Sequence, residues 1–297
     1  MQITCKRIRD EARDLIEVVL LPGLAVVLPW RVCFLIFKWL SHRRFLYRQS
    51  CERALLEATK RGWVADPDAW ISNRRLVTLI DHADHYLTRT RSDAWMKRHL
   101  AVQGNWPSPN NAALLLTFHW GAGMWALRHA QSSGLKAHML VAAVNGDHFC
   151  GHKIFHLYIK ARTRSIALAL KRPTVDVSVS LRPVLRGLKA QEQIIAVIDV
   201  PADQVSASQT IDILRMKARI PTALLRVAVE QRTPVSLFLT GIRMSDGQRF
   251  LRVTELGIYD DLHALIRDVF QVLENAIEED PPAWHFWSEA ERFFSPP

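Results

Sequence analysis

The chain has few cysteines, and they follow no regular pattern. Four cysteines are scattered over 297 residues, without the paired spacing of a disulfide framework or a structural zinc site. We therefore expect reduced thiols, as in a protein that faces the cytosol. The sequence also lacks an internal repeat and a low-complexity tract.

Acidic residues are scarce outside the C-terminal end. Residues 101–254 contain 19 Lys and Arg against 8 Asp and Glu, whereas residues 255–297 contain 2 against 10. The net charge is +10, and its central concentration suits an acidic partner such as an anionic lipid headgroup, a carrier protein or nucleic acid. Basic and aromatic residues do not interleave as in a stacking platform, and no DNA- or RNA-binding motif occurs. We expect no nucleic-acid partner.

Two groups of metal-ligand residue types lack the spacing of a metal site. One histidine pair, His152 and His156, is one helical turn apart, but neither group has the paired pattern of a structural zinc site. We therefore expect no metal. The two groups are Asp81-His82-Ala-Asp84-His85 and His148-Phe-Cys150-Gly-His152 with His156.

The N-terminal region is apolar but does not form a clean membrane span. Residues 18–37 have the length of a helix that crosses a bilayer, yet Arg31 interrupts them and prolines occur at 22 and 29. No small-x-small cleavage site follows, which argues against a signal peptide. Three alternatives stay open: one anchor helix, two shorter interfacial helices broken near Pro29, or a buried helical hairpin of a soluble domain.

Basic residues on both sides of the apolar segment favour membrane attachment. We therefore assign residues 1–45 to a membrane anchor or interfacial helices, and residues 46–297 to one α/β domain. Residues 46–100 read as a helical lead-in to that domain.

After a loop at 103–111, short apolar runs alternate with helical patterns. This alternation predicts an α/β fold, with a mixed and mostly parallel sheet covered by helices. A hairpin around Ser245-Asp-Gly-Gln and a closing helix over 262–277 complete it. The expected strands lie near 112–118, 137–143, 165–170, 194–199 and 234–240, and the expected helices near 122–133, 149–162, 177–190 and 218–231.

The strand expected at 112–118 ends in a candidate catalytic residue. His119 follows the apolar run, and a Gly121-x-Gly123 turn leads into the next helix. A histidine at the tip of a core strand is held rigidly while its imidazole faces a cleft, which is the position that a general base requires. The alternative is a core histidine that bonds a backbone carbonyl.

Several motifs, taken in order, carry a family resemblance. The apolar N-terminus, the basic helical lead-in, the His119-x-Gly121 strand end and a strand ending in Asp199 precede a closing Pro282-x-x-x-Phe286-Trp287 with Arg292-Phe293. Together they resemble the late (lauroyl/myristoyl-type) acyltransferases of bacterial lipid A biosynthesis, within the lysophospholipid and glycerolphosphate acyltransferase superfamily.

The resemblance implies an enzyme of the cytoplasmic face of the bacterial inner membrane. Such an enzyme transfers an acyl chain from an acyl carrier protein thioester to a lipid or glycolipid acceptor, without a cofactor. It also implies that His119 is the general base, oriented by a carboxylate that follows it after four intervening residues. A non-catalytic relative that binds lipid or carrier protein is the alternative function.

This sequence departs from the family at the carboxylate, because Met124 occupies its position. Methionine neither accepts a strong hydrogen bond nor balances an imidazolium. Three explanations follow: a carboxylate comes from elsewhere, with Asp199 and Asp147 as candidates; His119 acts unaided on an easier acceptor; or the chain has lost catalysis. We take His119 and Asp199 as the predicted catalytic pair.

The remaining predicted site residues would bind substrate. Backbone N–H groups after Gly121 and Gly123 are candidate oxyanion donors, or these glycines serve the turn alone. The resemblance places a phosphate- or thioester-holding arginine at Arg162 or Arg164; a solvated helix end is the alternative. If residues 215–219 are extended, Arg215 and Arg219 lie with Lys217 on one cationic face, whereas in a helix they would be scattered.

Overall fold

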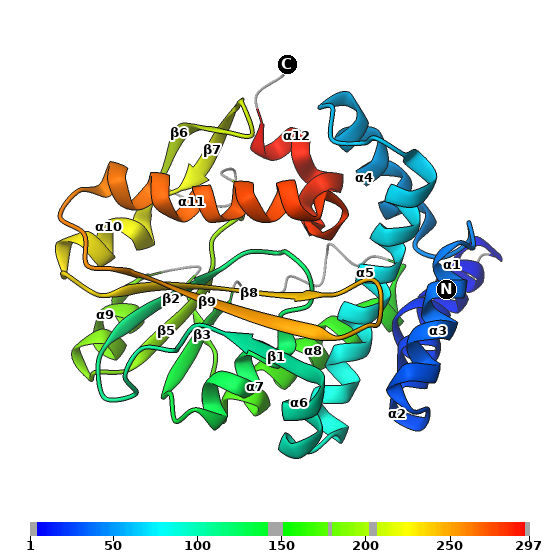
Figure 1. Ribbon diagram of the computed structural model, residues 1–297, viewed down its shortest axis with the longest axis horizontal. Coiled ribbons are helices and arrows are strands. Elements are labelled where there is room, and N and C mark those ends of the chain that lie inside the picture. Colours follow the sequence, from blue (N-terminus) through cyan, green and yellow to red (C-terminus); the bar gives the residue numbers. More distant parts are fainter. Residues whose placement is uncertain (1–4, 142–150, 178–179, 202–206, 295–297) are drawn as a thin grey trace.

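The computed structural model describes residues 5–141, 151–177, 180–201 and 207–294. Over these residues, a sheet of seven strands in the order β1-β9-β8-β2-β5-β3-β4 forms the centre of the molecule (Figure 1). Of its neighbouring pairs only β8 and β9 run antiparallel, so the mixed, mostly parallel sheet is confirmed. The strands are β1 (Leu100–Gln103), β2 (Ala113–Thr117), β3 (Ala137–Val141), β4 (Val175–Asp176), β5 (Gln193–Val197), β8 (Val235–Ile242) and β9 (Arg249–Gly257).

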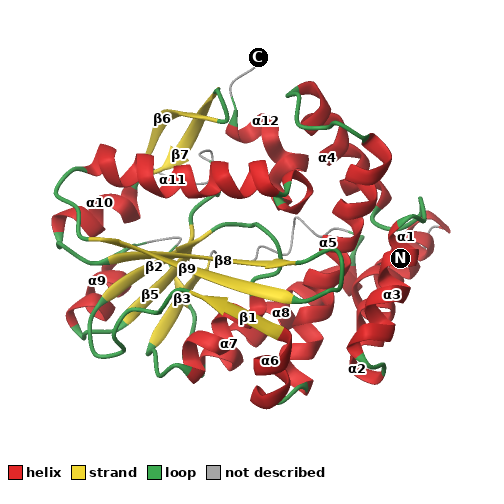
Figure 2. Cartoon of the chain, in the orientation of Figure 1, coloured by secondary structure: helices red, strands yellow, loops and turns green. Residues whose placement is uncertain are grey.

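Helices cover both faces of this sheet (Figure 2), as the α/β prediction requires. A separate antiparallel hairpin of β6 (Ser208–Ile213) and β7 (Met216–Pro221) lies beside α11. The α-helices after the apolar N-terminal region are α4 (Arg48–Lys60), α5 (Pro67–Thr90), α6 (Asp93–His99), α7 (Met124–Ser132), α8 (Lys153–Leu170), α9 (Arg182–Lys189), α10 (Ala223–Glu230), α11 (Leu262–Glu279) and α12 (Ala290–Phe293).

Four of the five predicted strands are confirmed, and the one at 165–170 is wrong. That segment is the last part of helix α8, which ends when Lys171 takes a left-handed conformation with φ +51°. A short apolar run does not distinguish a strand from a helix by periodicity alone. The predicted helix at 218–231 also begins too early, because its first residues belong to strand β7.

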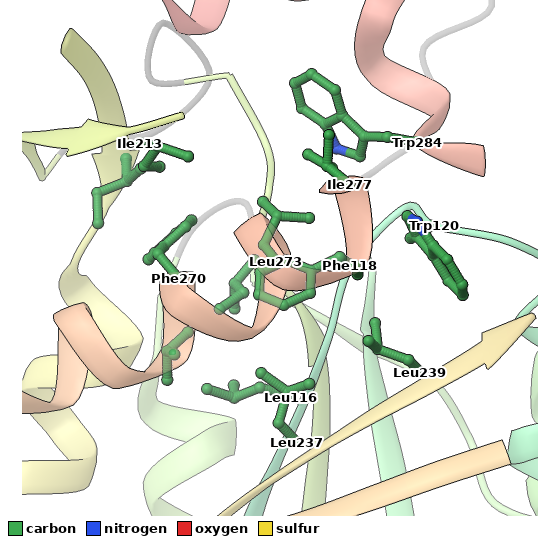
Figure 3. Close-up of a cluster of buried hydrophobic side chains, with 14 of the residues drawn as sticks. Leu116, Phe118, Trp120, Ile213, Leu237, Leu239, Phe270, Leu273, Ile277 and Trp284 are labelled. Atoms are coloured by element: carbon green, nitrogen blue, oxygen red, sulfur yellow. The ribbon is translucent and has the colours of Figure 1, made fainter. Parts of the chain in front are cut away.

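The side chains of β2 divide the core between the two sheet faces. Leu114 and Leu116 pack with α11, whereas Leu115 belongs to a second cluster together with residues of α5 and α7. Figure 3 shows Leu116 and the β8 leucines facing Phe270, Leu273 and other residues of α11. Alternate residues are therefore buried on opposite faces, as in a strand covered on both sides.

The apolar N-terminal region forms several short helices. The chain breaks at Pro29, as the alternative of two shorter helices expects, and no helix within the described residues has the length and apolarity to cross a bilayer. Membrane association stays a prediction. The helices are α1 (Cys5–Leu15), a π-helical segment (Ile16–Leu20), α2 (Leu21–Val27) and α3 (Trp30–Ser41).

Helix α3 has one face in the core and one in solvent. Cys33 and Phe37 are fully buried, while the side chains of Leu35 and Trp39 are 66% and 58% exposed. The Trp30 indole N–H donates to the Gly247 carbonyl of the β8–β9 turn (2.8 Å). Helix α3 is thus attached to the sheet by its buried face.

A buried ion pair connects these layers. The Arg249 guanidinium of β9 donates to Asp84 of α5 from Nε (2.9 Å), and its Cζ lies 3.8 Å from the centre of the Trp30 ring. Both charged side chains are fully buried. Because a buried charge is stable only with partners, Asp84 and Trp30 fix the relative positions of β9, α5 and α3.

Candidate active site

His119 and Asp199 lie at the same edge of the sheet because β2 and β5 pair in parallel. Thr117 of β2 and Val197 of β5 are register partners. His119 lies two residues after Thr117, and Asp199 lies two residues after Val197. The carboxyl ends of neighbouring parallel strands open onto one crevice in α/β sheets. The register therefore brings together two residues that are 80 positions apart in the sequence.

The Asp199 carboxylate is hydrogen-bonded both to the imidazole ring of His119 and to its backbone N–H. The Nδ1 atom of His119 lies 2.9 Å from Oδ1 of Asp199, and the backbone N–H of His119 lies 2.9 Å from both carboxylate oxygens. The indole N–H of Trp284 donates to Oδ2 at 2.9 Å. Because an ionised carboxylate only accepts, this arrangement places the imidazole proton on Nδ1 and leaves Nε2 as the basic nitrogen.

The pair combines a buried acid with an accessible ring. The Asp199 side chain is 1% exposed, whereas that of His119 is 39% exposed. The Phe286 ring packs edge-on against the imidazole, with centroids 4.4 Å apart. Such an arrangement can take a proton from a bound hydroxyl or amine and hold it as an imidazolium beside the carboxylate.

Two backbone N–H groups of the turn after His119, those of Gly121 and Ala122, are occupied by other partners. Gly121 N–H donates to the Ala283 carbonyl (3.0 Å) and Ala122 N–H to the Thr240 carbonyl (2.9 Å). These two groups are therefore not oxyanion donors in this structure. The N–H groups at the start of α7, from Gly123 onward, are the remaining candidates on this turn.

The two glycines of the turn differ in what they require. Gly121 has φ +69°, and a Cβ there would lie 2.1 Å from the Thr240 carbonyl oxygen of β8. Gly123 is exposed, has φ −76°, and has open space where a Cβ would lie. Of the two, only position 121 requires glycine, because a Cβ there would clash with the backbone of β8.

His285, in the C-terminal segment 282–285, hydrogen-bonds to the turn that begins at His119. His285 donates from its backbone N–H to the His119 carbonyl and from Nε2 to the Gly121 carbonyl, both at 2.7 Å. Burial lowers the pKa of His285 to about 4, so its imidazole is neutral at neutral pH. Arg74 of α5 in turn donates to the carbonyls of Pro282, Trp284 and His285.

Arg162 is part of a buried polar cluster beside this segment. Its guanidinium donates to Asp81 Oδ1 (2.7 Å) and to the Tyr158 hydroxyl (3.1 Å). Burial opposes ionisation of Asp81, but the charge and hydrogen bond of Arg162 and the neighbouring His285 and His82 together outweigh it and lower the pKa of Asp81 to about 2. Arg162 is thus paired within the protein.

The other predicted substrate-binding arginines lie on exposed surfaces. Arg164 is exposed on α8; Arg215 occupies the β6–β7 turn with φ +62°; Arg219 lies on β7 and donates to Ser208 (2.8 Å). The extended alternative is therefore confirmed for residues 216–219, which lie in β7, but not for Arg215, which lies in the turn before it. Over the described ranges, none of the four predicted arginines hydrogen-bonds to His119 or Asp199.

In the part of the chain that the structure describes, no group of three or more His, Cys, Asp or Glu residues is placed to hold a metal ion. His82 Nδ1 bonds the Tyr158 hydroxyl (2.6 Å), and Asp81 and Asp84 are paired with arginines. In the other group His152 bonds Asp14 (2.7 Å). His148 and Cys150 lie outside the described residues, as does Asp147, the other candidate acid.

Met124 is packed in the core and does not face solvent. It is the first residue of α7 and is 3% exposed. It belongs to the hydrophobic cluster that contains Leu115 and residues of α5 and α7. A carboxylate at this position would be surrounded by apolar side chains. The carboxylate that lies beside Nδ1 is instead that of Asp199, two residues after the end of β5.

A cavity of about 390 Å³ adjoins the segment that contacts the His119 ring. It lies between the N-terminal helices, α4, the start of α8 and the 3₁₀ turn His285–Glu289, which includes Phe286. Three arginines contribute to its lining: Arg13, Arg48 and Arg53. Their charges are partly balanced by acidic neighbours in the same lining, Asp14, Glu17 and Glu289.

Sequence reasoning missed Trp284, His285 and Arg74. Trp284 and His285 lie between Pro282 and Phe286 of the closing motif, so the sequence singles out this segment. It does not reveal the contacts of the segment with Asp199 and Gly121. Arg74 lies in a long helical pattern where nothing in the sequence distinguishes it from the solvated Arg residues nearby. Only its burial and its three carbonyl partners reveal a role.

The comparisons with known proteins give no further assignment. No family model matches the chain, and no curated protein matches it.

We expect acid to destabilise the protein partly through His285. The unfolded chain takes up a proton below about pH 6.5, whereas folded His285 resists protonation down to about pH 4. Stability is therefore lost as the pH falls through this interval. In His285→Gln, the amide can still donate to Gly121 but does not titrate, so urea-unfolding midpoints between pH 7 and 4.5 should decline less steeply. The exposed His263 provides the control His263→Gln, which should follow the wild-type curve; parallel curves for all three proteins would contradict the assignment.

Proposed function

We propose that this protein is a membrane-associated acyltransferase. It transfers an acyl chain from an acyl carrier protein thioester to a lipid or glycolipid acceptor, with His119 as the general base. The observation that supports this proposal is the bond between the Nδ1 atom of the accessible His119 and the buried Asp199 carboxylate. This bond supplies the orienting acid whose family position is taken by Met124.

The proposed step uses the free nitrogen of His119. Nε2 takes the proton of the acceptor hydroxyl or amine as its oxygen or nitrogen attacks the thioester carbonyl carbon. The tetrahedral adduct then collapses, the carbon–sulfur bond breaks, and the thiolate receives the proton from the imidazolium. Asp199 stabilises the charged imidazolium between these two transfers.

The surface of the N-terminal helices supports membrane association. Along α3, Val32, Leu35 and Trp39 are exposed at positions that share one helical face, and Val27 at the end of α2 is 75% exposed. Arg31, Lys38, Arg43 and Arg44 are also exposed in this region. An apolar face bordered by cations is typical of helices that lie in the interface of an anionic bilayer. We propose the cytoplasmic face of a bacterial inner membrane as the location.

His119→Gln should abolish acyl transfer, because the amide of glutamine does not take up the proton that Nε2 of His119 accepts in the proposed step. Asp199→Asn should lower kcat by about 10²–10⁴-fold, since the amide favours the wrong imidazole tautomer and does not balance its charge. Transfer is measured with purified protein, acyl carrier protein thioester and a membrane lipid extract, followed by mass spectrometry of the lipids. His263→Gln is the matched histidine control. Tight binding of donor or lipid with no transfer by the wild type would identify instead a binding protein that has lost the chemistry.

Met124→Glu should not increase activity. The new carboxylate would be buried among apolar groups, while Asp199 already holds the Nδ1 side of the ring. We expect a loss of about 2–4 kcal/mol in the free energy of unfolding, because an unpaired charge is costly in a core. Met124→Leu conserves the packing and is the control. A rise in transfer rate with unchanged stability would show that Asp199 is not the working acid.

Leu35→Glu/Trp39→Glu should weaken binding to vesicles of phosphatidylglycerol and phosphatidylethanolamine. Removal of two exposed apolar side chains from the proposed contact should lower the bound fraction by about tenfold or more in a sedimentation assay. Ile258, which is 52% exposed after β9, provides the control Ile258→Glu. Equal binding by the double variant and the wild type would exclude α3 from the membrane contact.

A further inference from the structure

Trp284 makes the one side-chain contact to the far oxygen of the Asp199 carboxylate that occurs among the described residues. Its indole N–H lies 2.9 Å from Oδ2, while the imidazole of His119 bonds Oδ1. Both partners are buried, Trp284 at 1% exposure and Asp199 at 0%. The carboxylate is thus held at both oxygens, with one directed to the ring and the other to the indole.

This contact matters because a carboxylate in a dry site depends on its donors. An ionised acid away from water is stable only when hydrogen bonds replace its hydration. The indole supplies one of those bonds and limits rotation of the carboxylate about its terminal torsion. Without it, the Asp199 carboxylate is free to rotate, and Oδ1 then no longer fixes the imidazole.

Trp284 is itself held in place from several directions. Its ring packs edge-on against Trp287, with centroids 5.0 Å apart, and against Phe293 at 5.5 Å. Its carbonyl accepts from Arg74 (2.9 Å), which is 5% exposed. A donor supported in this way is preorganised, so it does not have to be positioned during the reaction.

We propose that Trp284 is a positioning residue of the active site, which fixes Asp199 and, through it, the tautomer and orientation of His119. The inference rests on the proposed acyl transfer, and it assigns to the C-terminal segment a part in the chemistry in addition to its part in the core. Arg74 supports the same function one step further away.

Trp287 offers a matched control in the same segment. It is likewise fully buried and donates one indole hydrogen bond, but to the Pro281 carbonyl (2.7 Å). Trp284→Phe and Trp287→Phe therefore remove the same atoms and one buried hydrogen bond each. Only the first removes a bond to Asp199.

The first measurement requires no substrate. In protein labelled with ¹⁵N-histidine, the Nδ1–H signal of His119 is assigned by its loss in His119→Gln. We expect Trp284→Phe to shift this signal or broaden it by exchange with solvent, and Trp287→Phe to leave it in place. An unchanged signal in Trp284→Phe overturns the inference. If Trp284→Phe does not fold, a β-(3-benzothienyl)alanine residue at position 284 replaces only the N–H by sulfur and is compared in the same way.

The second measurement is kinetic. Loss of a hydrogen bond to a charged group should lower kcat by about 10–100-fold in Trp284→Phe, with KM within about twofold of the wild type. Trp287→Phe keeps an aromatic ring packed against Trp284 and should lower kcat by about twofold at most. Equal losses in both variants would indicate a structural role alone and overturn the inference. If His119→Gln retained full transfer, the proposed function would fail, whereas the NMR comparison would still decide whether Trp284 positions Asp199.

Discussion

The candidate site depends on the parallel pairing of β2 with β5. One register, with Thr117 opposite Val197, sets His119 and Asp199 at equal distances beyond the two strand ends. A shift of a single residue would direct the next side chain to the opposite face and separate the ring from the acid. The apolar residues that alternate across β2 maintain this register, because each face of the strand is buried against its own layer of helices.

The carboxylate of the candidate site comes from an unusual position in the sequence, but it lies in the usual position beside Nδ1 of the histidine. In the family that the sequence resembles, the carboxylate follows the histidine on the same turn. Here Met124 occupies that position and is buried in the core. The carboxylate comes instead from Asp199, just after the neighbouring strand β5. What the chemistry requires is an acceptor beside Nδ1, and the crevice at the ends of two parallel strands offers a second way to supply it.

The C-terminal segment completes the site from outside the sheet, and the N-terminal helix α3 is attached to the same sheet at the β8–β9 turn. Residues 282–285 are fixed by Arg74 and contact Asp199, His119 and Gly121. Helix α3 is fixed by Trp30 to the β8–β9 turn, beside the buried pair of Arg249 and Asp84. The predicted division between residues 1–45 and 46–297 stays a prediction, but part of the first segment shares a core with the second.

The sequence by itself determined the α/β class, four of the predicted strands, the hairpin, the closing helix and the histidine at a strand tip. Each of these follows from local periodicity or from turn residues, which act over a few positions. It did not distinguish the strand from the helix at 165–170, nor determine which arginines are paired internally. Tertiary structure alone decided that Asp199 faces His119, that Trp284 holds Asp199, and that the Gly121 and Ala122 N–H groups bond carbonyls of other segments. Those contacts join residues far apart in the chain, and their geometry depends on strand register and layer packing, which no local pattern encodes.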